Sequence, residues 1–174
     1  DEVSLSLSLH IAEQTKKDLL AEGKELPHHP GQAVLQNIGA TQGRIGKKAG
    51  KGFYDYNGKE KSLWPELTKL YPPVAQQPSQ QELVDRLLYV QANEAARCYE
   101  EKVVRSVADT NIGSIFGWGF APNQGGALQF INAVGPKKFV ERARELAKAH
   151  GSRFEPAAIV VKMAQEGGRF EDQA

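Results

Sequence analysis

The hydrophobic pattern at the start of the chain fits two kinds of secondary structure. Residues 3–9 alternate strictly between apolar residues and serine, which is typical of a half-buried strand. The apolar positions then continue at helical spacing, and no turn signal separates the two stretches. Gly23 follows in the position of a helix C-cap. The pattern therefore predicts one helix over residues 3–22, with a face made of Leu5, Leu9, Ala12, Lys16, Leu19 and Leu20.

The next part of the chain predicts short elements joined by loops. Residues 26–30 contain two prolines and are expected to form a loop. A short helix is predicted over residues 32–38 and should end near Gly39, and a second short helix is predicted over residues 65–70. Residues 72–78 are rich in proline and glutamine, so they form the best candidate boundary in the chain.

A glycine-rich stretch lies between these two short helices. Four of the ten residues from 43 to 52 are glycine, which excludes a stable helix there. The aromatic residues that follow have strand character, and Asn57-Gly58 is a strong turn signal. The sequence therefore predicts a small hairpin near residues 53–61.

The second half of the chain carries clear helical signals. Ser79 and Glu82 form a capping box, which opens a long helix that keeps its apolar spacing to about Lys102. A glycine-rich bend is expected over residues 117–126. Four shorter helices are predicted over residues 107–116, 127–134, 136–150 and 156–165. The predicted fold class is all-α.

Composition narrows the classes of protein that fit. The 174 residues include 22 basic and 21 acidic side chains, so the net charge of +1 argues against a dedicated nucleic-acid binder. The single cysteine, Cys98, excludes an internal disulfide framework. No apolar run approaches the roughly 20 residues that span a bilayer. The chain begins with Asp1 and no signal peptide is visible, so we expect an internal or C-terminal piece of a longer protein.

The basic glycine-rich segment is the first candidate for chemistry. Glycines let a backbone approach a phosphate closely, and Lys47, Lys48 and Lys51 could supply positive charge. A P-loop needs a serine or threonine after its lysine, whereas Gly52 follows Lys51, and the dinucleotide pattern of three spaced glycines is absent. A structural loop with solvated lysines is therefore the favoured interpretation, and a phosphate contact is the alternative.

The histidines and the cysteine form no recognisable site. His28 and His29 are adjacent among prolines, and no spacing typical of a metal site connects the four histidines, so no metal is expected. Cys98 lies in the predicted long helix, where a buried cysteine usually behaves as a small hydrophobic residue. Its neighbouring glutamates Glu94, Glu100 and Glu101 are more simply a solvated face.

The bend over residues 117–126 combines glycines with large aromatic side chains. Phe116, Trp118 and Phe120 could fill the core from a helix connector, which is the favoured interpretation. The alternative is that they form a wall for an acyl or pantetheine chain.

Two stretches resemble a known family. Residues 46–56 read Gly-Lys-Lys-Ala-Gly-Lys-Gly-Phe-Tyr-Asp-Tyr, similar to the signature that closes the C-terminal domain of 3-hydroxyacyl-CoA dehydrogenases. Residues 85–95 and the segment 119–135 resemble the second copy of that helical domain in the multifunctional fatty-acid oxidation enzymes, of the fatty-acid oxidation complex alpha subunit type. Residues 1–5 resemble a segment inside the first copy, so the resemblance covers nearly the whole chain.

The resemblance implies tandem helical domains of the 6-phosphogluconate-dehydrogenase C-terminal-like type. It places part of the first domain at residues 1–73, a linker at 74–78 and the second domain at 79–174. In the family, an enoyl-CoA hydratase domain and an NAD-binding Rossmann domain precede these helical domains. The catalytic His–Glu pair and the assisting Asn lie upstream of Asp1, so the resemblance supplies no catalytic or cofactor-binding residue to this chain.

Three residues are carried over as candidate substrate contacts. In bacterial relatives an aromatic residue, often tyrosine, precedes the glycine-rich bend and is associated with substrate binding. Its match is Phe116, which keeps the ring but lacks the hydroxyl group. Lys47 and Lys48 of the signature are the other two candidates. In the bend itself Ala121 stands before Pro122, where the family commonly has phenylalanine directly followed by proline.

The function implied is that of the substrate-cleft and scaffold portion of an NAD-dependent 3-hydroxyacyl-CoA dehydrogenase of fatty-acid β-oxidation. NAD would belong to the parent enzyme and not to this chain, which we expect to be inactive alone. The expected partners are an acyl-CoA substrate and the upstream Rossmann and hydratase domains, with homodimerisation left open. A cytoplasmic location is expected, without a membrane or nucleic-acid partner.

Two alternatives come from other classes of function. A non-catalytic helical assembly module would hold partner subunits through the aromatic bend. Nucleic-acid binding through the basic segment from Arg44 to Lys51 is weaker, because four charges stand against a nearly neutral whole.

Overall fold

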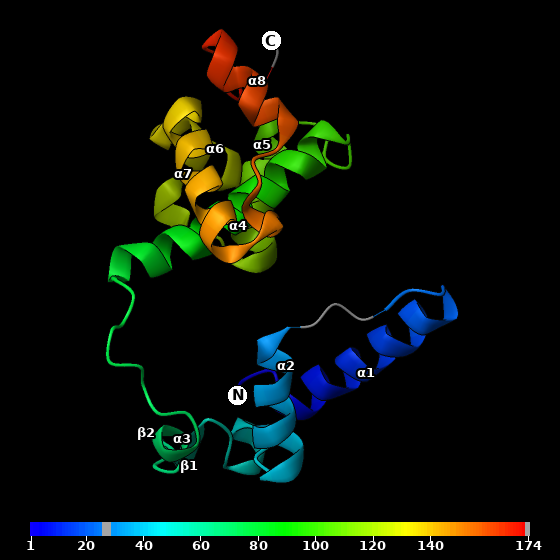
Figure 1. Ribbon diagram of the computed structural model, residues 1–174, viewed down its shortest axis with the longest axis vertical. Helices are drawn as coiled ribbons and strands as arrows, with labels where there is room; N and C mark the ends of the chain where they lie inside the picture. The colour runs from blue at the N-terminus through cyan, green and yellow to red at the C-terminus, as the bar shows by residue number, and fades with distance from the viewer. Residues whose placement is uncertain (26–28, 173–174) are drawn as a thin grey trace. The chain divides into compact units, whose positions relative to one another are not determined.

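The structure is a computed structural model that describes residues 1–25 and 29–172. The chain divides into two compact units, Asp1–Gln77 (unit 1) and Pro78–Ala174 (unit 2). Helices are the main regular structure of both units, and within the described residues a two-stranded hairpin is the one sheet (Figure 1). The predicted all-α class is therefore confirmed. The loop predicted over residues 26–30 falls largely on residues 26–28, which lie outside the described part.

Unit 1 contains one long helix, several short helical segments and the hairpin. Its elements are α1 (Leu5–Ala21), α2 (Pro30–Leu35), the π-helical turn η1 (Gln36–Thr41), the 3-10 turn η2 (Lys47–Ala49), β1 (Tyr54–Asn57), β2 (Glu60–Leu63) and α3 (Leu67–Leu70).

Helix α1 confirms the helical reading of the serine–leucine alternation. Its first backbone N–H, on Leu5, donates to the carbonyl of Ile45, and the Ser4 hydroxyl donates to the same carbonyl at 3.0 Å. Leu5 is buried, and the side chain of Leu9 packs over Gly39 so closely that a Cβ there would lie 2.8 Å from it. The prediction that the second helix ends near Gly39 is thus wrong, because this glycine is a packing contact and the helical turns continue to Thr41.

The hairpin forms where the turn signal placed it. Asn57 pairs with Glu60 across a two-residue loop, as is typical of tight hairpins. Gly58 opens this loop with φ of +61°, a conformation that glycine adopts without steric cost.

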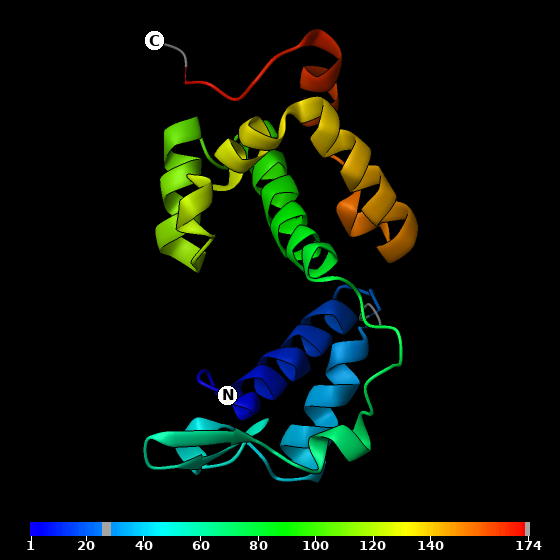
Figure 2. The same cartoon turned by 90° about the vertical axis from the view of Figure 1, so that its left-hand side faces the viewer.

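Unit 2 is a bundle of five α-helices joined by short turns. Its elements are α4 (Gln80–Glu100), α5 (Val107–Trp118), the 3-10 turn η3 (Pro122–Gln124), α6 (Ala127–Val134), α7 (Pro136–His150), the 3-10 turn η4 (Ser152–Phe154) and α8 (Ala158–Glu166). The 21-residue helix α4 packs against each of the other four helices. Figure 2 shows α4, in green, running through the middle of this unit.

The core of unit 2 is a single apolar cluster. Its centre is aromatic: the rings of Tyr89 and Phe139 stack at 4.5 Å, and Phe130 meets both rings edge-on. Burial raises the pKa of Tyr89 to about 12, because the charged phenolate is disfavoured there. One buried polar side chain of α4 holds the segment that leads into α8, since the Asn93 amide donates to the carbonyl of Glu155 and accepts from the N–H of Ala157.

The capping box at the start of α4 is only half formed. The Ser79 hydroxyl accepts from the backbone N–H of Glu82 at 3.1 Å, as predicted. The Glu82 carboxylate does not return to the backbone of Ser79. It binds Arg86, Arg142 and His150 instead.

The glycine-rich bend is shorter than predicted. Helix α5 continues through Gly117 and Trp118 and ends at Gly119, which adopts the left-handed conformation of a C-cap with φ of +76°. Gly126 then lets α6 begin against α5, because a Cβ at that position would lie 2.5 Å from the side chain of Asn111. The side-chain amide oxygen of Asn111 caps α6 by accepting from the backbone N–H groups of Leu128 and Gln129.

Candidate functional site

A groove between α4 and α5 is the leading candidate site of unit 2. Its volume is about 560 Å³, and carbon atoms form most of its walls. The residues of α4 that form one wall are spaced three or four apart, so they share one face of the helix. Residues of α5 form the opposite wall, and one residue of the connecting loop completes the lining. The lining residues are Gln91, Glu94, Ala95, Cys98, Val104, Asp109, Thr110, Gly113, Gly117 and Trp118. We call this feature the α4–α5 groove.

Two glycines keep the α4–α5 groove open. Gly113 and Gly117 lie one helical turn apart on α5, and a Cβ added at either position would meet nothing within 4 Å. At one end of the groove the indole N–H of Trp118 donates to the side-chain oxygen of Gln91 at 3.0 Å. The groove is therefore an apolar trough bounded by a hydrogen-bonded indole ring.

The polar groups of the α4–α5 groove offer little chemistry. The carboxylate of Glu94 is exposed and binds Arg97 at 2.9 Å, which fits the expected solvated face. Cys98 is half-buried and forms part of the wall, as a small hydrophobic residue would. No histidine stands among the described residues that line the groove. This arrangement suits the binding of an apolar group better than a reaction.

A second hollow, which we call the basic hollow, adjoins this groove. Its volume is about 840 Å³, and residues from the end of α4, the following loop and α8 form its walls. It shares Val104 with the α4–α5 groove. The lining residues are Tyr99, Glu100, Lys102, Val104, Arg105, Ala158, Ile159 and Lys162. Sequence reasoning missed the basic hollow, because Lys162 lies far along the chain from Lys102 and Arg105 and the three residues follow no motif.

The aromatic residues of the predicted bend separate into three roles. Phe120 is 1% exposed and fills the core, as the favoured interpretation expected. Trp118 is 54% exposed and lines the α4–α5 groove. Phe116 is 85% exposed and belongs neither to the core nor to the groove lining, so core filling is wrong for this residue. The difference arises because α5 includes both Phe116 and Trp118, whereas Phe120 follows the end of the helix.

In unit 1, the signature segment wraps around Asp1. The Asp1 carboxylate accepts from the backbone N–H groups of Phe53 and Tyr54, at 2.9 and 3.1 Å, and from the hydroxyl of Tyr56 at 2.8 Å. Gly52 makes this approach feasible, because a Cβ there would lie 2.3 Å from the carboxylate. The backbone N–H groups and glycines of the signature thus serve an internal carboxylate, which favours the structural interpretation of this loop.

The two signature lysines lie in the same 3-10 turn but have different surroundings. The Lys47 ammonium group binds the carboxylate of Glu2 at 2.9 Å, and this hydrogen bond lowers the pKa of Glu2. Lys48 lines a hollow of about 730 Å³ beside α1, where Leu7, His10 and Ile45 are among its neighbours. Lys48 is therefore better placed than Lys47 to meet a ligand. Phe116, the third predicted contact, belongs to unit 2.

Arg44 is a structural residue of unit 1. It is 7% exposed, donates to the carbonyls of Gly52 and Tyr54 and binds the Asp55 carboxylate at 2.5 Å. Its guanidinium group also stacks over the ring of Trp64 at 4.3 Å. The nucleic-acid alternative therefore loses one of its four positive charges to the interior.

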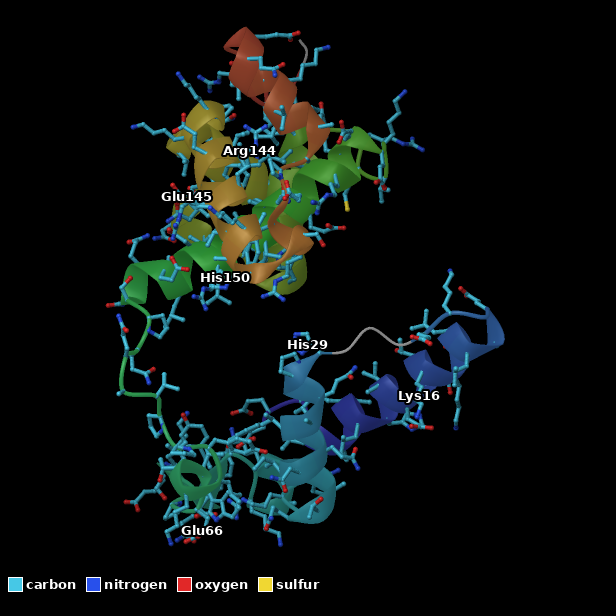
Figure 3. The ribbon with its side chains drawn as sticks, in the orientation of Figure 1. Lys16, His29, Glu66, Arg144, Glu145 and His150 are labelled. Atoms are coloured by element: carbon cyan, nitrogen blue, oxygen red, sulfur yellow. The ribbon has the colours of Figure 1, made fainter. Side chains whose placement is uncertain are left out.

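Two of the described histidines lie at helix ends and form hydrogen bonds there. His29 caps α2 by accepting from the N–H of Gly31, and His150 at the end of α7 contacts Glu82. Figure 3 labels both histidines. His28 lies outside the described residues. Among the residues that the structure describes, no group of three histidine, cysteine or carboxylate side chains is placed to hold a metal ion.

Glu82 is a carboxylate of unit 2 whose hydrogen bonds shift its pKa strongly. Hydrogen bonds from His150, Arg142 and Arg86 lower the pKa of Glu82 to about 2. Arg142 also binds Asp85 at 2.8 Å and Glu145 at 2.9 Å, so one guanidinium group joins α4 to α7. This cluster ties two helices together and lines neither of the two hollows of unit 2.

The described helices include none that is long and apolar enough to cross a membrane.

Comparison with known proteins indicates what the chain is related to. No family model matches the sequence. The chain is 38% identical over 133 residues to the fatty acid oxidation complex subunit alpha of Vibrio vulnificus (strain CMCP6). The matched region covers 76% of this chain and 19% of that much longer relative. The chain is thus homologous to a part of the fatty acid oxidation complex alpha subunit, which confirms the resemblance that its motifs indicated.

Proposed function

We propose that this chain is the C-terminal substrate-cleft and scaffold portion of an NAD-dependent 3-hydroxyacyl-CoA dehydrogenase of fatty-acid β-oxidation. The observation that carries this proposal is the 38% identity to an alpha subunit over 76% of the chain. The dehydrogenase signature at residues 46–56 and the apolar α4–α5 groove support it. Residues 1–73 would be part of the first helical domain and residues 79–174 would belong to the second, of the 6-phosphogluconate-dehydrogenase C-terminal-like type.

The described residues do not fit a nicotinamide dinucleotide. Their one sheet is an antiparallel hairpin, whereas a dinucleotide site uses parallel strands and a helix N-terminus. The signature loop gives the N–H groups of Phe53 and Tyr54 to the Asp1 carboxylate rather than to a phosphate. We therefore assign no step of hydride transfer to this chain, and the NAD site would belong to an upstream Rossmann domain.

The role left to this chain is to bind and shield the acyl substrate. Helical walls around a thioester would exclude water and strengthen the polar interactions of the reacting centre. Lys48 beside its hollow in unit 1 is one candidate substrate contact. Phe116 is the second candidate, because its ring is exposed on α5.

Calorimetric titration of the purified chain with acetoacetyl-CoA, and separately with NAD, tests this proposal. Heat with the thioester and none with NAD is the expected result, and the variants Lys48→Ala and Phe116→Ala should then bind more weakly than Lys59→Ala, an exposed matched control. Binding of NAD would overturn the placement of the chain. Steady NADH production from 3-hydroxybutyryl-CoA by the chain alone would overturn its lack of catalysis.

A second candidate function is a helical assembly module for partner subunits in the same cytoplasmic pathway. The observation that favours it is the outward face of α5, where Ile112 and Phe116 lie one turn apart and are 57% and 85% exposed. A self-associating chain, measured by sedimentation, that dissociates on Phe116→Asp or Trp118→Ala and binds no acyl-CoA would favour this function over the first.

A further inference from the structure

The two hollows of unit 2 meet and differ in character. The α4–α5 groove is mostly apolar, whereas Lys102, Arg105 and Lys162 line the basic hollow. Val104 lines both hollows, so the two lie next to each other in unit 2. Their volumes, about 560 and 840 Å³, each fall within the roughly 300–1,000 Å³ that small-molecule sites occupy.

The three cations of the basic hollow are available for an external anion. Within residues 1–25 and 29–172, none of them takes part in an ion pair with a carboxylate. Glu100 is the one acidic side chain in the same lining, so the local balance is positive. A hollow with this charge attracts a phosphate group through charge-assisted hydrogen bonds.

We propose that the α4–α5 groove and the basic hollow together bind a long-chain acyl-CoA. The acyl chain lies in the groove between α4 and α5, and the phosphates of the CoA moiety bind Lys102, Arg105 and Lys162. The proposal deepens the function proposed above and rests on it for the choice of acyl-CoA. It places the site within unit 2 and gives roles to residues that the family resemblance did not single out.

The composition of α5 supports this assignment. A glycine inside a helix is less favourable than alanine, yet Gly113 and Gly117 both stand on the wall of the groove. Neither is required by packing, because a Cβ at either position would meet no atom within 4 Å. Because these two residues have no side chain, they leave space in the groove that an acyl chain could occupy.

Binding of four ligands to the purified chain separates the two halves of the proposed site. Lauroyl-CoA should bind at least about tenfold more tightly than acetoacetyl-CoA, because the longer chain buries more apolar surface. It should also bind more tightly than laurate, which lacks the phosphates, and than CoA, which lacks the chain. Calorimetry gives the affinities, and the emission of Trp118 in a Trp64→Phe background reports on the groove itself.

Matched substitutions locate the site. Gly117→Leu adds a side chain to the groove wall, where a Cβ meets no atom within 4 Å, and should weaken lauroyl-CoA binding by about tenfold. Ala108→Leu, exposed on the same helix outside the groove, should not weaken it. Lys162→Glu should weaken lauroyl-CoA binding by about tenfold and should affect laurate binding less. Lys138→Glu, exposed on α7 outside both hollows, is the control for charge. Circular dichroism melts confirm that each variant is folded.

The results that would contradict this acyl-CoA site differ from those that would contradict the proposed function. Equal affinities for lauroyl-CoA and acetoacetyl-CoA, or lauroyl-CoA binding that neither Gly117→Leu nor Lys162→Glu weakens, would overturn this site while thioester binding itself survives. Laurate that binds as tightly as lauroyl-CoA would overturn the phosphate role of the basic hollow. Lauroyl-CoA binding that both variants weaken supports the site even if acetoacetyl-CoA and NAD give no heat.

Discussion

Unit 2 buries 19 hydrophobic side chains in one cluster, whereas only Leu5 and Ile38 are buried hydrophobic residues in the described part of unit 1. The two units are similar in length, at residues 1–77 and 78–174. Unit 1 instead relies on polar contacts that converge on Asp1 and Arg44. The two units are therefore stabilised differently. Unit 2 relies on the burial of apolar side chains, whereas unit 1 relies on hydrogen bonds between polar side chains and backbone groups.

This difference has a consequence for function. A unit with a large apolar core can tolerate open positions at its surface, such as the glycines of α5, because the core supplies its stability. A unit held by a few polar contacts depends on each of them, since a buried donor that loses its acceptor is left unsatisfied. The candidate acyl site accordingly lies in the unit with the larger core.

Loss of a core ring should give the largest effect and confine it to unit 2. Phe139→Ala removes a fully buried ring that stacks on Tyr89, and it should lower the free energy of unfolding of this unit by about 3–5 kcal/mol. Urea denaturation measures the change, with Trp118 fluorescence in a Trp64→Phe background as the reporter of unit 2.

The same substitution tests whether the units unfold independently. In a Trp118→Phe background the remaining Trp64 reports on unit 1, which should keep its midpoint when Phe139 is replaced. A joint shift of both transitions would show that the two units unfold as one cooperative body. That result would contradict the view that each unit is stabilised by its own interactions.

Removal of the Asp1 carboxylate should give the next largest effect, confined to unit 1. Asp1→Ala leaves the N–H groups of Phe53 and Tyr54 without their acceptor and should cost about 2–3 kcal/mol, monitored by Trp64. Gly52→Ala should give a similar loss, because its Cβ would occupy the position of the carboxylate. Glu2→Ala breaks only an exposed ion pair and is the control. If Asp1→Ala leaves the midpoint unchanged, unit 1 is not held by this residue.

Acid should weaken unit 2 through Glu82. Its carboxylate has a pKa lowered to about 2, so it stabilises the fold above the ordinary value of 4.5 and loses this contribution as the pH falls toward 2. Glu82→Gln should therefore lower the urea midpoint most at pH 7, and the difference from the unmodified chain should close near pH 2. Glu145→Gln, which removes one exposed contact to Arg142, is the control. Parallel curves for Glu82→Gln and the unmodified chain across this range would contradict the assignment.

Much of the fold could be predicted from the sequence because local signals and burial agree. The limits of α6 and α7 follow from Gly135 and Gly151, and the hairpin follows from Asn57-Gly58. The end of the second helix was not predictable, because Gly39 owes its place to the approach of Leu9 from α1. Only a tertiary contact distinguishes such a glycine from one that ends a helix.

The candidate site was less predictable than the fold. The spacing of Ala95 and Cys98 could indicate one helical face, but nothing local shows that it faces Gly113. The cations Lys102 and Lys162 come together through the packing of α8 beside the end of α4. The role of Asp1 as the acceptor for the signature loop likewise depends on a contact across some fifty residues of chain, which no periodicity reports.

The smallest predicted effect is a gain, and it sharpens the contrast between the glycines of the two units. Gly113→Ala should stabilise unit 2 by about 1 kcal/mol, because the residue is helical and its Cβ would meet no other atom within 4 Å. Gly119→Ala on the same helix should destabilise it by about 1 kcal/mol, since its φ of +76° disfavours any side chain. Gly39→Ala in unit 1 should destabilise because Leu9 occupies the space. If urea denaturation shows that Gly113→Ala also destabilises, then this glycine is structural and its presence on the groove wall no longer argues for a ligand.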